Sequence, residues 1–214
     1  MIKAFIFDMD GVLVNSEEMY FYRRMEFFNK IRVIPDSKQI SDYLGCSNER
    51  VWELLVNDPI RREQLKQQYF DYQKQHPINY KNYINDGVEQ FLKTLQKHHI
   101  TMILASAGAR TDIVGMLNDC KIKHYFNLIL SGEEVKHNKP APDIYLEALD
   151  KSGLDKQECI VIEDSKYGIQ AAKKAGIETW ALKPQNYTVD QSQANYVFEN
   201  FIKLNKKIIN ENFE

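Results

Sequence analysis

The feature that most constrains this chain is a repeated change between short, evenly apolar runs and segments long enough to be helices. The apolar runs are Ala4–Phe7, Thr101–Ala105, Asn127–Leu130, Cys159–Ile162 and Thr179–Leu182. They lack apolar–polar alternation, which is typical of strands buried on both faces of a parallel sheet. The pattern therefore predicts an α/β fold with a doubly wound, Rossmann-like parallel sheet.

Three of the intervening segments have amphipathic helical spacing. They are Val88–Lys97, Ile144–Lys151 and Tyr167–Lys174. Gly153 and Gly176 follow the second and third segments, where a residue with a left-handed backbone commonly ends a helix. These glycines predict the ends of two crossover helices.

One long region departs from the alternation. From about Ser16 to Tyr83 the spacing is helical only, with apolar residues at Leu54, Leu55, Leu65, Tyr69 and Tyr72. Helices that follow one strand, before strands resume, predict an all-helical cap domain of residues 15–83 inserted into a core of residues 1–14 and 84–214. Extra helices packed on the sheet are the alternative. The charged C-terminal stretch Lys203–Glu214 predicts a solvated helix or a frayed end.

Length and charge exclude several classes of protein. With 214 residues and a formal net charge of −2, the chain can bury a sizeable core but lacks the basic field of a nucleic-acid binder. Cys46, Cys120 and Cys159 form neither a zinc spacing nor a disulfide framework, so we expect reduced thiols. There is no signal-peptide pattern and no apolar run near the roughly 20 residues that span a bilayer. We expect a cytoplasmic protein with no nucleic-acid or membrane partner.

The polar residues beyond the predicted strands form one chemical set. In an open parallel sheet, ligands bind outside the carboxyl ends of the strands. Residues at three strand ends and in one loop are placed to meet there: Asp8 and Asp10, Ser106, Glu163 and Asp164, and Lys139. The sequence therefore predicts several carboxylates with one hydroxyl and one cation at a single point.

Such carboxylates cannot all stay ionised without a compensating cation, and oxygen ligands select a hard ion such as Mg²⁺. With its charge screened, Asp8 can attack a phosphorus atom as a nucleophile. Asp10 is placed to protonate the leaving oxygen and later to activate a water molecule. Ser106 and Lys139 would hold the oxygens of the transferred group.

Two turns add backbone donors to this set. Exposed amides in the Asp10–Gly11 and Ala107–Gly108 turns predict anion binding, and Gly11 permits a sharp turn away from the first strand. Taken singly, Ser106 is typical of a helix N-cap and Lys139 of a solvated surface charge. The joint occurrence of all these residues in the right order favours phosphoryl transfer.

Four segments carry a family resemblance: Phe7-Asp8-Met9-Asp10-Gly11-Val12-Leu13, Ala105-Ser106, Lys139-Pro140-Ala141-Pro142-Asp143 and Ile162-Glu163-Asp164-Ser165. Together they resemble the four motifs of the haloacid dehalogenase-like hydrolase superfamily. The helical insertion directly after the first motif is similar to that of the β-phosphoglucomutase-like branch.

The resemblance implies a role for each matching residue. Asp8 would be the nucleophile, and Asp10 would be the general acid/base whose backbone carbonyl also binds Mg²⁺. Asp164 would be a metal ligand, with Glu163 at or beside the metal. Phosphate would be bound by Ser106, Ala107, Lys139 and Gly11, of which Ser106 and Lys139 are counted with the catalytic residues. The presence of Asp10 disfavours dehalogenation, and the family implies a monomer.

Other positions depart from β-phosphoglucomutase. That enzyme has a cap histidine where this chain has Tyr20, and an arginine after a Gly-x-Ser turn where this chain has Asn48. Gly108-Ala109-Arg110 replaces a serine-lysine-asparagine run that helps to hold the second phosphate. Loss of these donors disfavours a mutase. The candidate substrate contacts are Ser16, Tyr20, Asn48, Lys74 and Arg110.

Three functions are consistent with these residues. The favoured one is a Mg²⁺-dependent phosphatase that acts on a small phosphorylated metabolite such as a sugar phosphate, with water attacking an aspartyl-phosphate. The cap would close to exclude bulk water and contact the leaving group. The first alternative is a β-phosphoglucomutase-type mutase that returns the phosphoryl group to another hydroxyl. The second is a non-catalytic phosphate-binding regulatory protein, which a retained nucleophile at Asp8 disfavours.

Overall fold

A six-stranded sheet organises the larger part of the chain. Its strands are β1 (Ala4–Phe7), β2 (Thr101–Ser106), β3 (Leu128–Ser131), β4 (Cys159–Glu163), β5 (Glu178–Leu182) and β6 (Tyr196–Phe198). All neighbouring strands are parallel, in the order β3-β2-β1-β4-β5-β6. The predicted α/β fold with a parallel sheet is confirmed.

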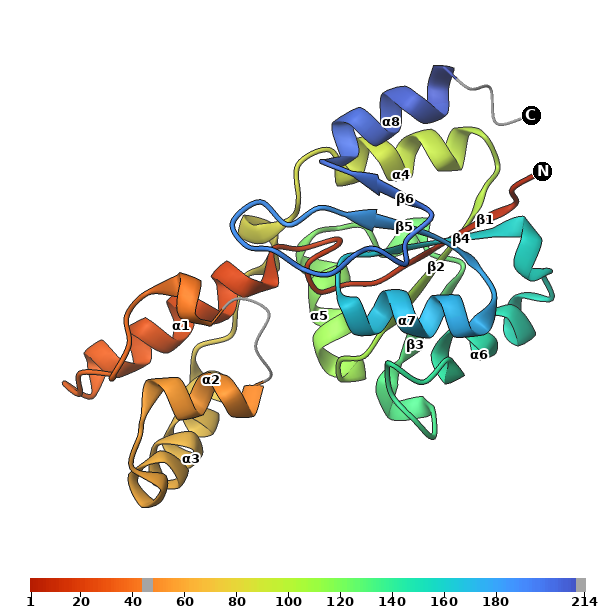
Figure 1. Ribbon diagram of the computed structural model, residues 1–214. Coiled ribbons are helices and arrows are strands. Elements are labelled where there is room, and N and C mark those ends of the chain that lie inside the picture. The colour runs from red at the N-terminus through yellow and green to blue at the C-terminus, as the bar shows by residue number, and fades with distance from the viewer. Residues whose placement is uncertain (44–47, 211–214) are drawn as a thin grey trace. The chain divides into compact units, whose positions relative to one another are not determined.

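The computed structural model describes residues 1–43 and 48–210. The chain forms two compact units, which are Met1–Asn15 with Tyr80–Glu214, and Ser16–Asn79 (Figure 1). The sheet belongs to the first unit, and the second unit is helical. Cys46 and residues 211–214, on which expectations were stated, lie outside the described residues.

The place of β1 in the sheet defines where a ligand should bind. β1 pairs with β2 on one side and with β4 on the other, so Phe7 lies opposite both Leu104 and Ile162. The chain extends the sheet from β1 through β2 to β3 and then crosses back to β4. This reversal makes a topological switch point between β1 and β4, and ligands of such sheets bind outside the carboxyl ends of the strands there.

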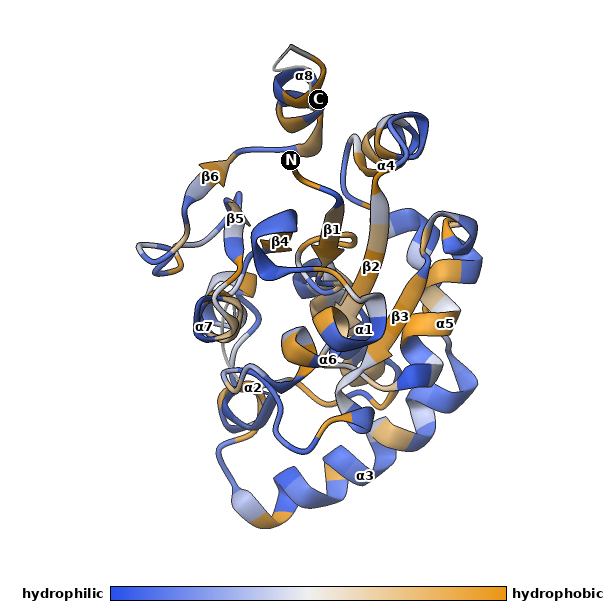
Figure 2. Cartoon of the chain, turned by 90° about the vertical axis from the view of Figure 1, so that its right-hand side faces the viewer, coloured by the Kyte–Doolittle hydropathy of each residue, from blue (hydrophilic) through white to orange (hydrophobic). Residues whose placement is uncertain are grey.

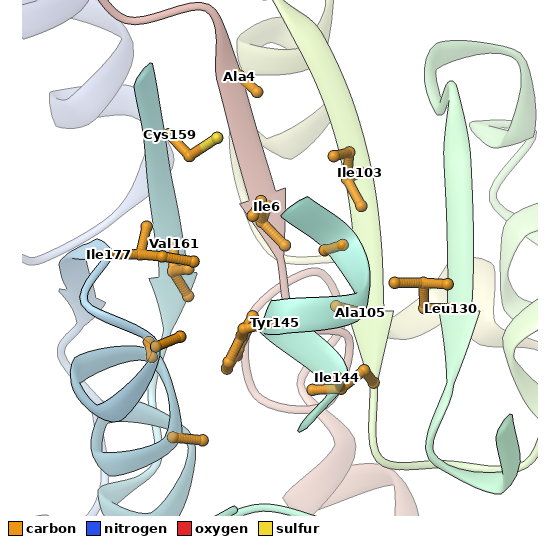
Figure 3. Packing of buried hydrophobic residues seen from close by; sticks show 14 residues of the cluster. Ala4, Ile6, Ile103, Ala105, Leu130, Ile144, Tyr145, Cys159, Val161 and Ile177 are labelled. Carbon is orange, nitrogen blue, oxygen red and sulfur yellow. The ribbon is translucent and has the colours of Figure 1, made fainter. Parts of the chain in front are cut away.

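Aliphatic side chains fill one face of the sheet under α6 (Asp143–Ser152) and α7 (Lys166–Ala175). Figure 3 shows Ile6 and Val161 on neighbouring strands, with Tyr145 of α6 in the same buried cluster. Tyr145 is fully buried, although it carries a hydroxyl that needs a hydrogen-bond partner. That partner is a carboxylate of the candidate site.

Aromatic side chains fill the opposite face, because alternate residues of β1 point to opposite sides of the sheet. The Phe5 ring centroid lies 5.6 Å from that of Phe91 on α4 (Val88–Lys97) and 5.8 Å from that of Trp180 on β5. These edge-to-face contacts are favourable for aromatic rings. The sheet is therefore covered on both sides, as the lack of apolar–polar alternation in its strands predicted.

The C-terminal helix corrects one expectation. α8 (Phe201–Asn210) is not a solvated helix or a frayed end, since Phe201, Leu204 and Ile208 are buried. The Phe201 ring centroid lies 5.4 Å from that of Phe91. The three buried residues form one helical stripe that the intervening lysines and asparagines obscured in the sequence.

The remaining helices of this unit follow the predicted pattern. α4 has the predicted bounds, and α6 and α7 each extend one residue further at both ends than predicted. Gly153 and Gly176 end α6 and α7 with φ angles of 67° and 78°, as predicted for left-handed caps. α5 (Arg110–Asp119) joins β2 to β3. Short 3₁₀ turns occupy Tyr80–Tyr83, Lys123–Tyr125, Gly132–Glu134 and Lys156–Glu158.

The helical unit has a core of its own. It contains α1 (Ser16–Lys30), α2 (Asn48–Leu55), α3 (Pro59–Gln75) and a 3₁₀ turn at Ile40–Asp42. Its buried residues are Phe27, Phe28, Tyr43, Val51, Trp52, Leu55, Val56, Leu65 and Tyr69. Figure 2 shows α3 as largely hydrophilic, whereas β1 and β2 are largely hydrophobic. The cap domain predicted from the sequence, residues 15–83, begins one residue before this unit and ends four residues after it.

The edge strand β6 was not predicted from the sequence, because its three residues, Tyr196–Phe198, are too few to show a period. Cys159 is buried and Cys120 is half-buried, and both are free thiols. Among residues 1–43 and 48–210, no helix has the length and apolarity needed to cross a membrane.

Candidate active site

The turn after β1 positions the first two carboxylates. Asp8 follows β1 directly, and its N–H donates to the carbonyl of Ile162 on β4. The Met9 carbonyl accepts the N–H groups of residues 12–14 at 2.9–3.3 Å, which closes the turn. Gly11 adopts a φ of 76° within it, as predicted.

A second segment fastens this turn. The Asn85 side-chain amide donates to the carbonyls of Gly11 at 3.2 Å and Val12 at 2.8 Å. The N–H of Asn85 donates to the carbonyl of Leu13. Asn85 therefore fixes the loop that carries Asp8, a role that the sequence analysis did not predict.

Lys139 reaches the predicted nucleophile from the loop before α6. Its Nζ lies 2.6 Å from Asp8 Oδ1 and 2.7 Å from Glu163 Oε1, and it donates to the Ala105 carbonyl at 3.2 Å. The Lys139 side chain is only 7% exposed. The structure thus brings the predicted cation and the predicted nucleophile into direct contact.

Both oxygens of Glu163 are occupied by hydrogen-bond donors. Oε1 accepts from Lys139 and, at 2.7 Å, from the Tyr145 hydroxyl. Oε2 accepts from the N–H of Asp164 and from both the N–H and the hydroxyl of Ser165. Glu163 is fully buried. These contacts make it the partner that holds Lys139 in place.

Asp164 presents another buried carboxylate. The Asp164 carbonyl accepts a hydrogen bond from Gln191 Nε2 at 2.7 Å, which holds its backbone. Its side chain lies against Gly11, where an added Cβ would stand 2.0 Å from Asp164 Oδ2. One carboxylate oxygen from each of Asp8, Glu163 and Asp164 lies within 4.8 Å of the other two. The result is a compact set of oxygen donors.

Burial and mutual repulsion shift the protonation of these groups. Burial raises the pKa of Asp8 to about 7, although the nearby Lys139 charge opposes this. Burial, together with Glu163 and Asp8, raises the pKa of Asp164 well above its ordinary value. Burial also acts to raise the pKa of Glu163, but the charge and hydrogen bond of Lys139 outweigh it and the pKa is lowered. Asp8 and Asp164 therefore lack enough nearby positive charge to keep both carboxylates ionised.

Ser106 and Asp10 meet at the loop after β2. Ser106 is fully buried, and its Oγ accepts the N–H of Gly108 at 3.1 Å. A Cβ added at Gly108 would lie 3.4 Å from Ser106 Oγ and 3.9 Å from Asp10 Oδ2, so both side chains border Gly108. The Ser131 hydroxyl donates to the Gly108 carbonyl at 2.8 Å, and Ala107 is exposed. The structure thus brings together three predicted parts of the site: Ser106, Asp10 and the Ala107–Gly108 turn.

Arg110, a candidate substrate contact, is paired with an acidic side chain in the structure. Its Nε donates to Glu134 Oε1 at 2.7 Å, and its Nη2 also contacts that oxygen. The N–H of Arg110 donates to Glu133. The guanidinium is therefore engaged in an ion pair beside the start of α5.

The other four candidate substrate residues lie in the helical unit. Ser16 begins α1 and is buried, whereas Lys74 is exposed on α3, 3.6 Å from Asp71. Tyr20 lies beside two arginines of α1, and Asn48 accepts a hydrogen bond from one of them. Neither arginine was predicted from the sequence, nor were Tyr145 and Gln191, because no motif marks these residues.

A family model described as haloacid dehalogenase-like hydrolase matches residues 5–182, which include all four motif segments. The chain therefore belongs to the haloacid dehalogenase-like hydrolase family. Within that family it falls in the β-phosphoglucomutase-like branch, as the helical insertion predicted.

Three similar proteins illustrate the match. The phosphorylated carbohydrates phosphatase of Thermotoga maritima is 29% identical over 198 residues, covering 83% of each chain. The fructose-1-phosphate phosphatase YqaB of Escherichia coli is 25% identical, covering 81% of this chain and 92% of its own. The crystal structure of β-phosphoglucomutase from Clostridium difficile is 25% identical with a TM-score of 0.70, covering 99% of this chain and 96% of that one.

Proposed function

We propose that this protein is a Mg²⁺-dependent phosphatase that acts on a small phosphorylated metabolite, a sugar phosphate, through an aspartyl-phosphate on Asp8. The observation that carries the proposal is the 2.6 Å contact between Lys139 Nζ and Asp8 Oδ1, beside buried Asp164. Relatives named for phosphorylated carbohydrates and for fructose 1-phosphate support the substrate class. The expected enzyme class, a haloacid dehalogenase-like phosphoric monoester hydrolase, is confirmed by the comparisons.

The residues divide the reaction into two displacements. In the first, an oxygen of Asp8 forms a bond to phosphorus while the bond from phosphorus to the leaving oxygen breaks. Asp10 gives its proton to that leaving oxygen. In the second, Asp10 takes a proton from a water molecule that attacks the same phosphorus, which releases inorganic phosphate and restores Asp8. Lys139 and Ser106 would hold the phosphoryl oxygens and neutralise their charge.

The donor set fits Mg²⁺ because it consists of oxygens and because Asp8 and Asp164 lack compensating charge. Asp8, Asp164 and the backbone carbonyl of Asp10 would hold the ion. We assign Glu163 a place beside the metal, since its oxygens already accept from Lys139 and neighbouring donors. When bound, the ion supplies positive charge that screens Asp8 and the phosphoryl oxygens.

A β-phosphoglucomutase-type mutase is the second candidate, because the Clostridium difficile enzyme shares the fold over nearly the whole chain. Tyr20 and Asn48 stand where that enzyme's donors are expected, and Arg110 is paired with Glu134. Loss of these donors favours water over a second sugar hydroxyl as the acceptor. The phosphatase is therefore the preferred proposal.

The test is a screen of the purified chain with Mg²⁺ against phosphorylated sugars and polyols, including β-glucose 1-phosphate. Both free phosphate and isomerised sugar phosphate are measured. We expect phosphate release that EDTA stops and added Mg²⁺ restores. Conversion of β-glucose 1-phosphate to glucose 6-phosphate would favour the mutase, and activity unchanged in EDTA would remove the metal from the proposal.

A further inference from the structure

A glutamine in the loop between β5 and β6 bridges the ends of two neighbouring strands (Figure 1). Gln191 Nε2 donates to the Asp164 carbonyl at 2.7 Å and to the Leu182 carbonyl at 2.8 Å. The side-chain amide nitrogen of glutamine has two N–H donors, so both of them are used. The pairing of β4 with β5 ends at Glu163 and Ala181, each one residue before these carbonyls. Gln191 therefore continues the connection between the strands where their own pairing has ended.

The loop that carries Gln191 is itself fastened to β5 and to α7. On one side of Gln191, Asp190 forms an ion pair with Lys166 of α7 at 3.2 Å. On the other side, the N–H of Asn195 donates to the Thr179 carbonyl at 2.8 Å. Asn195 Oδ1 also accepts from the N–H of Thr179 at 3.0 Å. The Gln191 side chain thus extends from a loop that is held in place on both sides.

The residue that Gln191 holds is a carboxylate under electrostatic repulsion. One oxygen of Asp164 lies within 4.8 Å of an oxygen of Asp8 and of one of Glu163, and all three residues are buried. Like charges repel more strongly in such a site than in water. The N–H of Asp164 donates to Glu163 Oε2 at 3.1 Å, and its carbonyl accepts from Gln191. These bonds fix the Asp164 backbone against a force that would move its side chain away from Asp8.

We propose that Gln191 is a positioning residue for the metal ligand Asp164, and that it raises the affinity of the site for Mg²⁺. The inference rests on the metal site of the proposed function, in which Asp164 is a ligand. Mg²⁺ demands a near-ideal arrangement of its oxygen ligands, so a carboxylate already in place binds the ion better than one that must first be drawn back. Residues that hold metal ligands commonly change metal affinity by roughly 10- to 100-fold.

A purely structural role for Gln191 predicts a different result. Loss of its two hydrogen bonds would then lower the stability of the chain equally with and without Mg²⁺, and the affinity for the ion would not change. The positioning role predicts weaker binding of the ion itself, because Asp164 moves away from Asp8 in the metal-free protein once the tether is lost. The Mg²⁺ dependence of Tm separates the two roles, since an ion that binds the folded state stabilises it according to its concentration and affinity.

The test is thermal unfolding of the full chain in EDTA and over a series of Mg²⁺ concentrations. Gln191→Met keeps the length of the side chain and removes both donors. The dissociation constant of Mg²⁺, obtained from the rise in Tm, should increase roughly tenfold. The Mg²⁺ concentration for half-maximal phosphate release should rise by the same factor, with little change in kcat at saturating Mg²⁺. Gln193→Met, an exposed position in the same loop, is the matched control and should bind Mg²⁺ as wild type does.

Gln191→Glu is a second variant, for the case in which Gln191→Met does not fold. It keeps the shape of the side chain, but an ionised carboxylate has no donor for the two carbonyls. Its added negative charge would by itself strengthen the binding of a cation, so weaker binding of Mg²⁺ by this variant supports the lost tether as the cause. Wild-type or tighter binding of Mg²⁺ by the folded variant would overturn the inference.

Phosphate release separates this inference from the proposed function. If the Gln191 variants weaken Mg²⁺ binding but no phosphorylated sugar releases phosphate from the wild type, the proposed function fails and the positioning role of Gln191 stands. If the wild type is an active phosphatase and the variants bind Mg²⁺ equally well, the inference alone fails. A wild-type Tm that Mg²⁺ does not change would remove the metal from the proposed function and overturn the inference with it.

Discussion

Replacing the proposed nucleophile should stabilise the metal-free protein while it abolishes turnover. Asp8 is buried among carboxylates, and its pKa is raised from 3.8 to about 7. The folded protein therefore binds a proton at Asp8 more tightly than the unfolded chain does. By linkage, the free energy of unfolding that this group contributes falls as pH rises from about 4 to about 7. Above pH 7, the folded state carries the full cost of ionising buried Asp8. Asp8→Asn removes that cost.

The magnitude follows from the same pKa. Ionising Asp8 at pH 8 disfavours the folded state by on the order of 4 kcal/mol. The pKa of about 7 already includes the opposing charge and hydrogen bond of Lys139, so the loss of that contact is not subtracted a second time. We expect a gain of up to about 4 kcal/mol, or a Tm higher by several degrees for a chain of this size.

The assay is urea and thermal unfolding of wild type and Asp8→Asn in EDTA at pH 8 and at pH 4. The variant should be the more stable protein at pH 8, and the difference should shrink at pH 4. Asp190→Asn is the control, because hydrogen bonds from Ser192 lower the pKa of this exposed carboxyl and its loss should not stabilise. A variant equal to or weaker than wild type at pH 8 would refute the reasoning.

Two further predictions concern the residues that support the site and the sheet. Tyr145→Phe removes the hydroxyl that donates to Glu163, so we expect kcat to fall about tenfold with little change in KM and stability to fall by about 1.5–3 kcal/mol. Steady-state kinetics and urea unfolding check this against Tyr167→Phe, an exposed position on α7 that should behave as wild type. Phe201→Ala should cost about 3–5 kcal/mol in urea unfolding because the ring is fully buried, whereas Ile202→Ala, half exposed, should cost far less. Equal losses at the two positions would mean that α8 does not dock through this stripe.

The fold and the motif residues could be predicted because each has a local signal. Evenly apolar runs such as Cys159–Ile162 predict buried parallel strands, and parallel pairing then brings their carboxyl ends to one edge. This is why Asp8, Lys139 and Asp164 were grouped before their contacts were known. The sharp turn at Gly11 was likewise predictable, because glycine directly after a strand-end motif permits the positive φ that the turn adopts.

The missing parts depend on contacts that carry no local signal. Tyr145 and Gln191 reach the site through single hydrogen bonds from a helix and a loop, and many tyrosines and glutamines make no such contact. The pairing of Arg110 with Glu134 likewise has no local signal, because the two residues lie 24 positions apart in the chain.

The central claim is that the phosphoryl group passes through Asp8. The most direct measurement is rapid acid quenching of a single turnover with the best substrate of the screen, followed by mass spectrometry of the peptide that contains Asp8. The account predicts one phosphoryl group on Asp8 that appears and decays within the turnover, and none in Asp8→Asn. Release of phosphate with no phosphorylated Asp8, or turnover by Asp8→Asn, would contradict it.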